Sequence, residues 1–373
     1  MAARSTPPFR ADHVGSLLRP KKLLEARDDF ANGRITADEL RGIEDDAVRD
    51  VVQMQKDVGL QSATDGEFRR ASWHMDYIYE IGGINKVEGD IKVEFRNEQG
   101  TIEFTPAAIH VDSKINLDHP IFADAFKYLQ SVASDGVTPK LTIPSPSMVH
   151  YRGGRAAIDD AVYPDIEEFW RDLSAAYADE VRELAALGCR YLQFDDTSLA
   201  YLNDPRQREM MAQQGADAEH LHETYIRNIN RALENRPDGI AITTHMCRGN
   251  FRSSWVAEGG YDFVAEALFG QLNVDGFFLE YDDARSGGFE PLRFVPEGKM
   301  VVLGLVTTKR GELESKDELK RRIEEASRYV PVEQICLSPQ CGFSSTVEGN
   351  VVTYDEQVAK LSLIVETTQE VWG

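Results

Sequence analysis

The sequence predicts a closed (β/α)8 barrel of the TIM type, with a β-hairpin inserted after the second strand. Short apolar runs alternate with longer amphipathic stretches along all 373 residues, as expected for βα units around a parallel sheet. No low-complexity linker or break in composition divides these alternations. Barrels of this kind commonly exceed about 250 residues, so residues 1–373 are expected to form a single domain. A doubly wound open sheet is the alternative arrangement.

Eight apolar runs have the length of strands and are bounded by polar or turn-forming residues. The expected strands are Ala11–Leu18, Leu60–Asp65, Lys140–Ile143, Tyr191–Phe194, Ile240–Thr244, Gly276–Leu279, Met300–Val306 and Gln334–Leu337. The stretches between them repeat apolar residues with the period of a helix. The expected helices are Thr36–Val58, Asp165–Leu187, Asp204–Asn235, Tyr261–Leu268 and Lys316–Tyr329.

Residues 86–115 interrupt this alternation. Apolar and polar residues alternate one by one through Ile91-Lys92-Val93-Glu94-Phe95, and Asn97-Glu98-Gln99-Gly100 has the composition of a turn. This pattern predicts an antiparallel hairpin inserted after the second strand. On the loop face of a barrel such a hairpin forms either a wall or lid of the active site or a plain decoration.

Composition excludes several classes of partner. The formal net charge of −22 argues against nucleic acid and against anionic membrane surfaces. The N-terminus has no apolar signal region, and no run approaches the roughly 18 apolar residues of a membrane span. Four cysteines in a long chain without a secretion signal fit a reducing compartment, so the cytoplasm is the expected location. Composition leaves open whether the chain forms a homo-oligomer.

Polar residues gather where the predicted strands end. The carboxyl ends of the strands form the active site of a (β/α)8 barrel. In this chain the polar strand ends are His13-Val14-Gly15-Ser16, Asp65-Gly66-Glu67, Asp195-Asp196, His245-Met246-Cys247, Glu280-Tyr281-Asp282 and Cys341-Gly342. The chemistry of this protein is therefore expected at that rim.

Four of these residues form a candidate zinc site. His245 and Cys247 are two residues apart, so on extended backbone their side chains point to the same side. Glu280 and Cys341 end two other strands of the same rim. Two sulfurs, one nitrogen and one carboxylate oxygen suit Zn²⁺, whereas Mg²⁺ and Ca²⁺ prefer oxygen alone.

The alternative for each residue is a packing role. A lone buried cysteine usually acts as a small hydrophobic residue. Cys189 and Cys336 fit that role better than metal binding, since Cys336 lies inside an apolar strand.

Together these motifs resemble the zinc-binding half of cobalamin-independent methionine synthase. The resemblance is carried by Val14-Gly15-Ser16, Asp65-Gly66-Glu67, Gln193-Phe194-Asp195, His245-x-Cys247, Phe277-Phe278-Leu279-Glu280 and Ser338-Pro339-Gln340-Cys341-Gly342, in the order of the family. It implies a TIM-type barrel with Zn²⁺ bound by His245, Cys247, Glu280 and Cys341.

The resemblance also implies a homocysteine-like thiol as the substrate. Its carboxylate would meet the backbone amides around Gly15 and Ser16, and its ammonium would meet Glu67 and Asp195. An amide-rich turn suits a carboxylate, and two carboxylates suit an ammonium. The alternative for Glu67 and Asp195 is an ordinary ion pair with Arg69 or Arg70. Bound zinc would deprotonate the thiol, which then attacks a methyl or other alkyl carbon.

The sequence departs from the family on the side of the methyl donor. Full-length synthases carry two related barrels, and this chain is long enough for the catalytic one alone. After the seventh strand the family has an Asp-x-His motif, whose histidine is a proton donor, whereas Lys309 stands at that place here. Lys309 and Asp195 are the candidate catalytic residues. Lys309 would donate a proton or bind an anionic donor, and an ordinary solvated lysine is the alternative. The loop 142–147 resembles the folate-side loop of the family only loosely.

The first hypothesis is a short methionine synthase whose methyl donor is a simple methyl-folate or a methylated corrinoid protein. The second is a related zinc alkyltransferase that joins another thiol, such as coenzyme M, to an epoxide-type electrophile. Glu67 and Asp195 favour the first, because a sulfonate thiol needs Arg or Lys instead. A zinc hydrolase is a third hypothesis, although two thiolate ligands make zinc-bound water a weaker acid. A purely structural zinc is the fourth.

Overall fold

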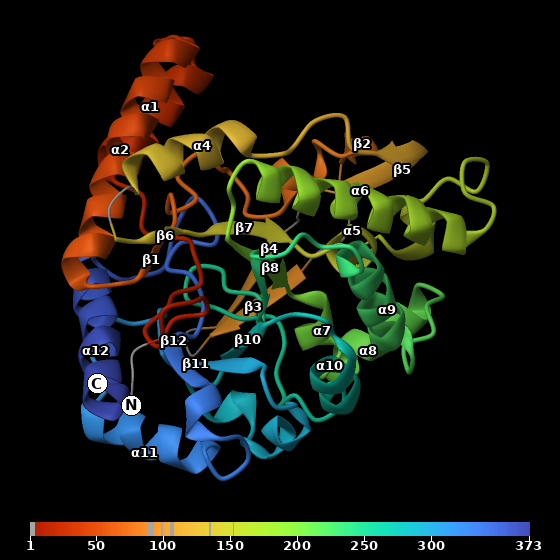
Figure 1. Cartoon of the computed structure of the whole chain (residues 1–373). Helices are drawn as coiled ribbons and strands as arrows, with labels where there is room; N and C mark the ends of the chain where they lie inside the picture. Colours follow the sequence, from red (N-terminus) through yellow and green to blue (C-terminus); the bar gives the residue numbers. More distant parts are fainter. Residues whose placement is uncertain (1–3, 89–92, 98–99, 105–107, 134–135, 152) are drawn as a thin grey trace.

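The computed structural model has an α/β architecture with a parallel sheet inside and helices outside (Figure 1). It describes residues 4–88, 93–97, 100–104, 108–133, 136–151 and 153–373. The strands are β1 (Ser62–Ala63), β2 (Gly82–Val87), β3 (Val93–Asn97), β4 (Gly100–Phe104), β5 (Ala108–Asn116), β6 (Thr138–Pro139), β7 (Leu141–Pro144), β8 (Tyr191–Asp196), β9 (Ala241–Met246), β10 (Gly276–Glu280), β11 (Met300–Val306) and β12 (Ile335–Pro339).

The α-helices cover the outside of the sheet in Figure 1. They are α1 (Lys21–Ala31), α2 (Ala37–Val58), α3 (Met75–Ile78), α4 (Ala123–Val132), α5 (Ser147–Tyr151), α6 (Ile166–Ala186), α7 (Ser198–Tyr201), α8 (Pro205–Gln213), α9 (Leu221–Leu233), α10 (Ala265–Gln271), α11 (Lys316–Ala326) and α12 (Tyr354–Trp372). None of the described helices combines the length and apolar character that a membrane crossing requires.

The main sheet has six parallel strands in the order β12-β11-β10-β9-β8-β7. Beyond β12, Ala11 forms a parallel bridge with Leu337. At the β7 end of the sheet, β6 comes just before β7 in the chain, and β6 pairs in parallel with β1. The described contacts between β1 and the segment around Ala11 are isolated hydrogen bonds and form no strand pairing. In one of them, Leu17 N–H donates to the Gly66 carbonyl at 3.1 Å. The carboxyl ends of the strands therefore face one common rim.

The strands form where the sequence is continuously apolar. Every residue of β11 is buried, and the other strands of the main sheet are buried almost throughout, as expected when helices cover a parallel sheet. The outer helices have clear start signals. Thr36 and Glu39 form a capping box at the start of α2, and Thr353 and Glu356 form another at α12.

Several predicted elements differ in extent from the structure. The expected strand Leu60–Asp65 is shortened to Ser62–Ala63, and the expected helix Tyr261–Leu268 is found at Ala265–Gln271. The expected strand Ala11–Leu18 makes a bridge only at Ala11, because the Asp12 carboxylate accepts hydrogen bonds from Phe9 N–H and His13 N–H and turns the chain toward the rim. The expected helix Asp204–Asn235 is two helices, α8 and α9, because the chain between them takes a left-handed conformation at Gly215 (φ 83°). Helices α1, α4 and α12 were not predicted.

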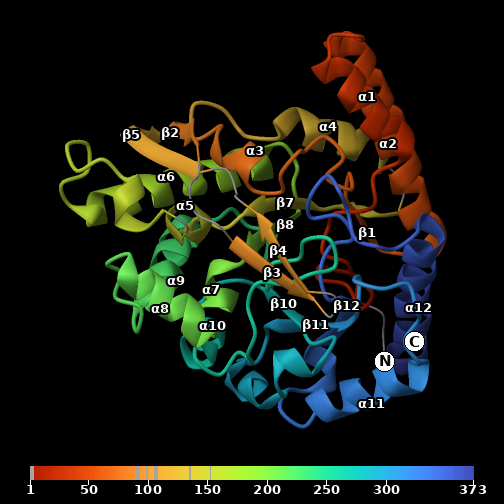
Figure 2. The ribbon, with the colours of Figure 1, turned by 180° about the vertical axis from the view of Figure 1, so that it is seen from behind.

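The expected hairpin at 86–115 lies in a segment of two antiparallel pairs, β2 with β5 and β3 with β4. Residues 91–92 and 98–99, which belong to the predicted strand and turn, lie outside the described residues. In Figure 2 the β3–β4 pair crosses in front of the strands of the main sheet. The backbone of Arg96 joins this pair to Trp255 through two hydrogen bonds, of 2.8 and 2.9 Å. The inserted segment therefore lies over the rim.

Buried Glu180 on α6 makes the stability of the fold depend on pH. Its side chain has no exposed surface and accepts a hydrogen bond from Ile121 N–H at 3.0 Å. Burial raises the pKa of Glu180 from 4.5 to about 8, so the folded protein holds this carboxyl neutral at intermediate pH. An acid with a raised pKa in the folded state stabilises the fold below its unfolded pKa, and that stability is lost as pH rises through the folded value.

We predict that Glu180→Gln flattens the loss of stability between pH 4.5 and about 8. Glutamine keeps an oxygen for Ile121 N–H and has no charge to bury. In the wild type, Glu180 lowers the free energy of unfolding by at most about 1.4 kcal/mol for each unit by which the pH rises in this range. Thermal and urea unfolding at several pH values measure it, with exposed Glu209→Gln on α8 as the control. Parallel stability curves for the wild type and Glu180→Gln would contradict the prediction.

Candidate metal centre and substrate pocket

The structure brings His245, Cys247, Glu280 and Cys341 together at the rim. One ligand atom from each lies within 4.8 Å of the others, and all four side chains are buried. His245 lies in β9, Glu280 ends β10, and Cys341 follows β12 by two residues. Three strands of one parallel sheet, β9, β10 and β12, thus supply the four side chains, with β11 lying between β10 and β12.

The chemistry of this cluster fits a Zn²⁺ ion. The two sulfurs are 3.4 Å apart, close to the about 3.8 Å that separates two thiolates on a tetrahedral zinc. Both ring nitrogens of His245 are buried without a hydrogen-bond partner among the described residues. The hydrogen bond to Cys341, together with burial, raises the pKa of the Cys247 thiol well above its usual value. Only a cation would hold both sulfurs as thiolates here, so the residues fit the metal.

Arg248 fixes the surroundings of Glu280. The backbone N–H of Arg248 donates to Glu280 Oε1 at 3.0 Å, and its buried guanidinium donates to the Glu280 carbonyl at 2.9 Å. The same guanidinium donates to the Gly259 carbonyl and lies over the ring of Tyr261. This network orients the carboxylate, as second partners of metal ligands commonly do.

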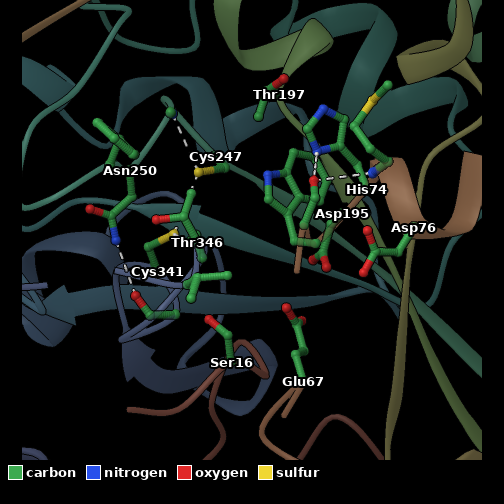
Figure 3. A pocket seen from close by; sticks show the side chains of 18 of the residues that line it. Ser16, Glu67, His74, Asp76, Asp195, Thr197, Cys247, Asn250, Cys341 and Thr346 are labelled. Carbon is green, nitrogen blue, oxygen red and sulfur yellow. Dashed lines mark hydrogen bonds between the residues drawn. The ribbon is translucent and has the colours of Figure 1, made fainter. Parts of the chain in front are cut away.

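Figure 3 shows the pocket beside this cluster, with Glu67 and Asp195 pointing into it. The cavity has a volume of about 350 Å³, within the size range of small-molecule sites. Asp195 in β8 is the register partner of His245 in β9, so the two side chains share one face of the sheet. Both predicted ammonium-binding carboxylates therefore lie next to the candidate metal centre.

The electrostatics of Glu67 and Asp195 favour a bound cation. Burial and the nearby charge of Glu67 raise the pKa of Asp195 to about 7. Glu67 Oε1 accepts from the Thr142 hydroxyl at 2.8 Å, while Oε2 is buried without a partner among the described residues. The alternative prediction for Glu67 is an ion pair with a neighbouring arginine. Arg70 does lie 3.6 Å from Glu67 Oε1, so this ion pair is present beside the unpartnered Oε2. Arg69 instead pairs with Glu44 at 3.0 Å.

Ser16 lines the cavity, and Gly15 precedes it in the turn. A side chain at Gly15 (φ 149°) would collide with Thr142, since an added Cβ would lie 2.7 Å from its methyl group. Ser16 lines the pocket and packs against the loop after Cys341, where Phe343 N–H donates to the Ser16 carbonyl at 3.0 Å. The turn predicted to receive a carboxylate thus lies beside Cys341 of the candidate metal centre.

Lys309 is not brought to the pocket. Its ammonium forms an ion pair with Asp282 at 2.9 Å, both side chains are largely buried, and Lys309 is absent from the residues that line the cavity. Burial opposes ionisation of Asp282, yet Lys309 and Arg285 outweigh it and lower the pKa of that carboxyl. The structure thus shows Lys309 in a buried ion pair, and its predicted catalytic role stays a prediction.

We predict that Lys309→Met destabilises the fold without changing the site. The substitution leaves Asp282 buried with only Arg285, at 3.5 Å, as a charged partner. The expected loss is about 1–3 kcal/mol of unfolding free energy, measured by urea denaturation. Zinc content and the KM for the acceptor thiol should match those of the wild type. A large fall in kcat with unchanged stability would instead restore a catalytic role for Lys309.

Sequence reasoning missed part of the pocket. The segment between β1 and α3 contributes Trp73 and His74, and the inserted pair contributes Phe95. The loop after Cys341 contributes Thr346 and Glu348. Trp73 and His74, six and seven residues after Glu67, were the available signal.

Comparisons with known proteins identify the family of this chain. Residues 9–370 match the family model described as the catalytic domain of cobalamin-independent synthase. The Bacillus subtilis protein YxjG, of uncharacterised function, is 47% identical over 371 residues, which cover 99% of this chain and 96% of that protein. The methionine synthase of Pyrococcus abyssi is 24% identical over 88% of this chain and 84% of its own length.

Two solved structures share the fold. One, from Listeria monocytogenes and assigned as a vitamin-B12-independent methionine synthase, has a TM-score of 0.79 and 39% identity, covering 99% of this chain and 100% of that one. A B12-independent methionine synthase from Shewanella, in complex with selenomethionine, has a TM-score of 0.71 and 17% identity over 97% of both chains. The chain therefore belongs to the catalytic-domain family of the cobalamin-independent synthases and is a methyltransferase of that type.

Proposed function

We propose that the protein is a zinc-dependent homocysteine S-methyltransferase that forms methionine. The observation that carries this proposal is the juxtaposition of two sets of residues in one pocket. His245, Cys247 and Cys341 of the candidate metal centre line the same cavity as Glu67 and Asp195. A thiol and an ammonium of one small amino acid can therefore be bound at the same time.

The acceptor is bound by its two charged ends. Its ammonium lies between Asp195 and the unpartnered Oε2 of Glu67. Its carboxylate meets the backbone of the Gly15–Ser16 turn. A sulfonate thiol such as coenzyme M fits this pocket poorly, because Lys86 is the only Lys or Arg among the described lining residues. The amino-acid thiol is therefore favoured over the alternative acceptor.

His245, Cys247, Glu280 and Cys341 would hold the Zn²⁺ ion. When bound, zinc lowers the pKa of a coordinated thiol and so supplies a thiolate at neutral pH. Glu67 and Asp195 place the acceptor sulfur at the rim, and the inserted β3–β4 pair limits the access of water. Holding the two reactants in line removes the entropy cost of their encounter.

The finer features of the fold belong to the same proposal. We infer that the eight consecutive strand positions, from the Ala11 segment to β12, form a complete (β/α)8 barrel. The two antiparallel pairs then form one insertion on its loop face. We further infer that residues 1–373 act as one catalytic domain. The match over residues 9–370 supports this inference.

Zinc-edge X-ray absorption of the zinc-loaded protein tests the proposal directly. Adding homocysteine should add a sulfur neighbour to the zinc shell, and a thiol of equal length without the amino group should do so only at higher concentration. Methionine formation with a methyl donor is the second measurement. An absorption spectrum that stays unchanged at saturating homocysteine would refute the acceptor and the role of the metal.

A further inference from the structure

Five aromatic side chains of the described residues line the pocket and are together called the aromatic wall. Trp73, Tyr79, Phe95, Tyr201 and Phe251 all line the cavity. The rings of Phe95 and Phe251 pack 5.0 Å apart, which joins the inserted pair to the loop after Cys247. At the exposed mouth the Lys86 ammonium lies 5.8 Å from the centroid of the Tyr79 ring. Ring faces carry partial negative charge, so a wall of this kind attracts organic cations.

The charges of the pocket act in the same direction. Its described lining includes four carboxylates, Glu67, Asp76, Asp195 and Glu348, against the single ammonium of Lys86. Glu67 and Asp195 are assigned to the acceptor in the proposed function, so Asp76 and Glu348 remain for the second substrate. Asp76 Oδ2 accepts a hydrogen bond from Ala71 N–H at 2.6 Å, and Glu348 lies 3.9 Å from the Arg252 guanidinium. The formal net charge of −22 adds a long-range field of the same sign. An anionic donor with carboxylate groups is repelled by this pocket, whereas a cationic donor is attracted.

The β3–β4 pair, which lies over the rim, limits the size of the methyl donor. The backbone hydrogen bonds between Arg96 and Trp255 hold the β3–β4 pair across the rim, and Asn97 Nδ2 donates to Ser254 Oγ at 2.8 Å. The cavity beneath has a volume of about 350 Å³. A corrinoid held by another protein would reach the sulfur only after these contacts broke. A small molecule needs no such opening.

The leaving group supplies a further constraint. A methyl group leaves an amine nitrogen readily only when that nitrogen gains a proton, and Lys309 is held by Asp282 away from the lining. An onium donor needs no acid. The thiolate sulfur forms the new S–CH3 bond with its lone pair, and the pair of the broken bond stays on the departing sulfur or nitrogen. The products are neutral, and the thiol proton passes to solvent.

We propose that the methyl donor is a small methyl-onium cation, a sulfonium or a quaternary ammonium, bound between the aromatic wall and the carboxylates Asp76 and Glu348. This proposal rests on the homocysteine methyltransferase activity proposed above and specifies the class of its second substrate. The cationic centre lies against ring faces, and the methyl carbon points toward the acceptor sulfur.

A donor comparison tests the proposal with the full-length zinc protein and homocysteine. The donors are trimethylsulfonium, S-methylmethionine, tetramethylammonium, monoglutamyl methyl-folate and methylcobalamin, each with a deuterated methyl group. We expect labelled methionine from a sulfonium or the ammonium at a rate at least about 10-fold above the folate and cobalamin arms. Comparing the rates with the sulfonium salts and with tetramethylammonium shows which of the two onium classes is the donor.

The same comparison distinguishes two kinds of failure. Methionine from methyl-folate or methylcobalamin, with none from the onium salts, overturns the onium donor and leaves the proposed function standing. Methionine from no donor also overturns it. In that case the absorption spectrum with homocysteine decides whether the acceptor assignment fails as well.

Substitutions in the wall test where the cation binds. Glu348→Gln and Phe251→Leu should each raise the KM for the onium donor by roughly 3- to 30-fold, the range of a single cation contact. The KM for homocysteine and the zinc content should stay unchanged, since neither residue belongs to the acceptor or metal sites. Glu209→Gln, which removes one exposed charge on α8 outside the pocket, is the matched control. A donor KM equal to that of the control in both variants would overturn the placement.

Discussion

Replacing Cys341 with serine is expected to remove most of the bound zinc and nearly all methyl transfer. The Cys341 sulfur lies 3.4 Å from that of Cys247, and a hydroxyl in its place is a far poorer ligand for zinc. Loss of a partner that only supports a ligand already costs about 10- to 100-fold in metal affinity, so the loss of a ligand should exceed about 100-fold. Zinc content by mass spectrometry and competition with a chelator measure it.

Cys189→Ser is the matched control for this substitution. Cys189 is fully buried, and its thiol contacts the Tyr191 carbonyl at 3.5 Å, an acceptor that a serine hydroxyl can also use. Its zinc content should equal that of the wild type. Full zinc retention in Cys341→Ser would show that the ligand set is wrong.

Glu67→Gln is expected to weaken homocysteine binding by about 10- to 100-fold, the effect of removing one charged partner from a buried hydrogen bond. Glutamine keeps an oxygen for the Thr142 hydroxyl, so the local fold should persist. The loss should appear in the KM for homocysteine, with zinc content unchanged. The variant should also bind a thiol without an amino group as well as the wild type does.

Steady-state kinetics with both thiols, and thermal unfolding of each variant, check this expectation. Glu209→Gln serves again as the control for the removal of a single charge. An equal fall for both thiols would assign Glu67 to the support of the pocket. An unchanged KM for homocysteine would argue against an amino-acid acceptor.

The main sheet could be predicted because its local signal is strong. Continuous apolar runs such as Met300–Val306 form strands almost wherever they occur in an α/β chain, and β11 has the predicted bounds. The first strand could not be predicted in extent. Its apolar pattern continues to Leu18, but the contacts of Asp12 with Phe9, His13 and Tyr191 turn the chain, and two of these partners are local while Tyr191 is 179 residues away.

In the site, too, residues at strand ends could be predicted from the sequence, whereas residues on loops could not. The predicted metal ligands and the carboxylates Glu67 and Asp195 lie at strand ends, where the parallel topology makes their proximity follow from the fold class. Lys309 also ends a strand, yet its side chain is taken by Asp282. The aromatic wall comes from Trp73, Phe95 and Phe251, which lie on loops and on the inserted pair. Their positions depend on contacts such as the bridge between Arg96 and Trp255.

The sequence by itself determined the parallel α/β architecture, the family and the set of side chains available for a metal and an ammonium. These properties follow from periodicity and from residue type at strand ends, which are local. The tertiary structure decided which of those side chains share one pocket, that Lys309 is paired with Asp282, and that aromatic rings and carboxylates line the same cavity. The physical reason is that loop conformations and ion pairs depend on partners far away in the chain, whose positions no local pattern specifies.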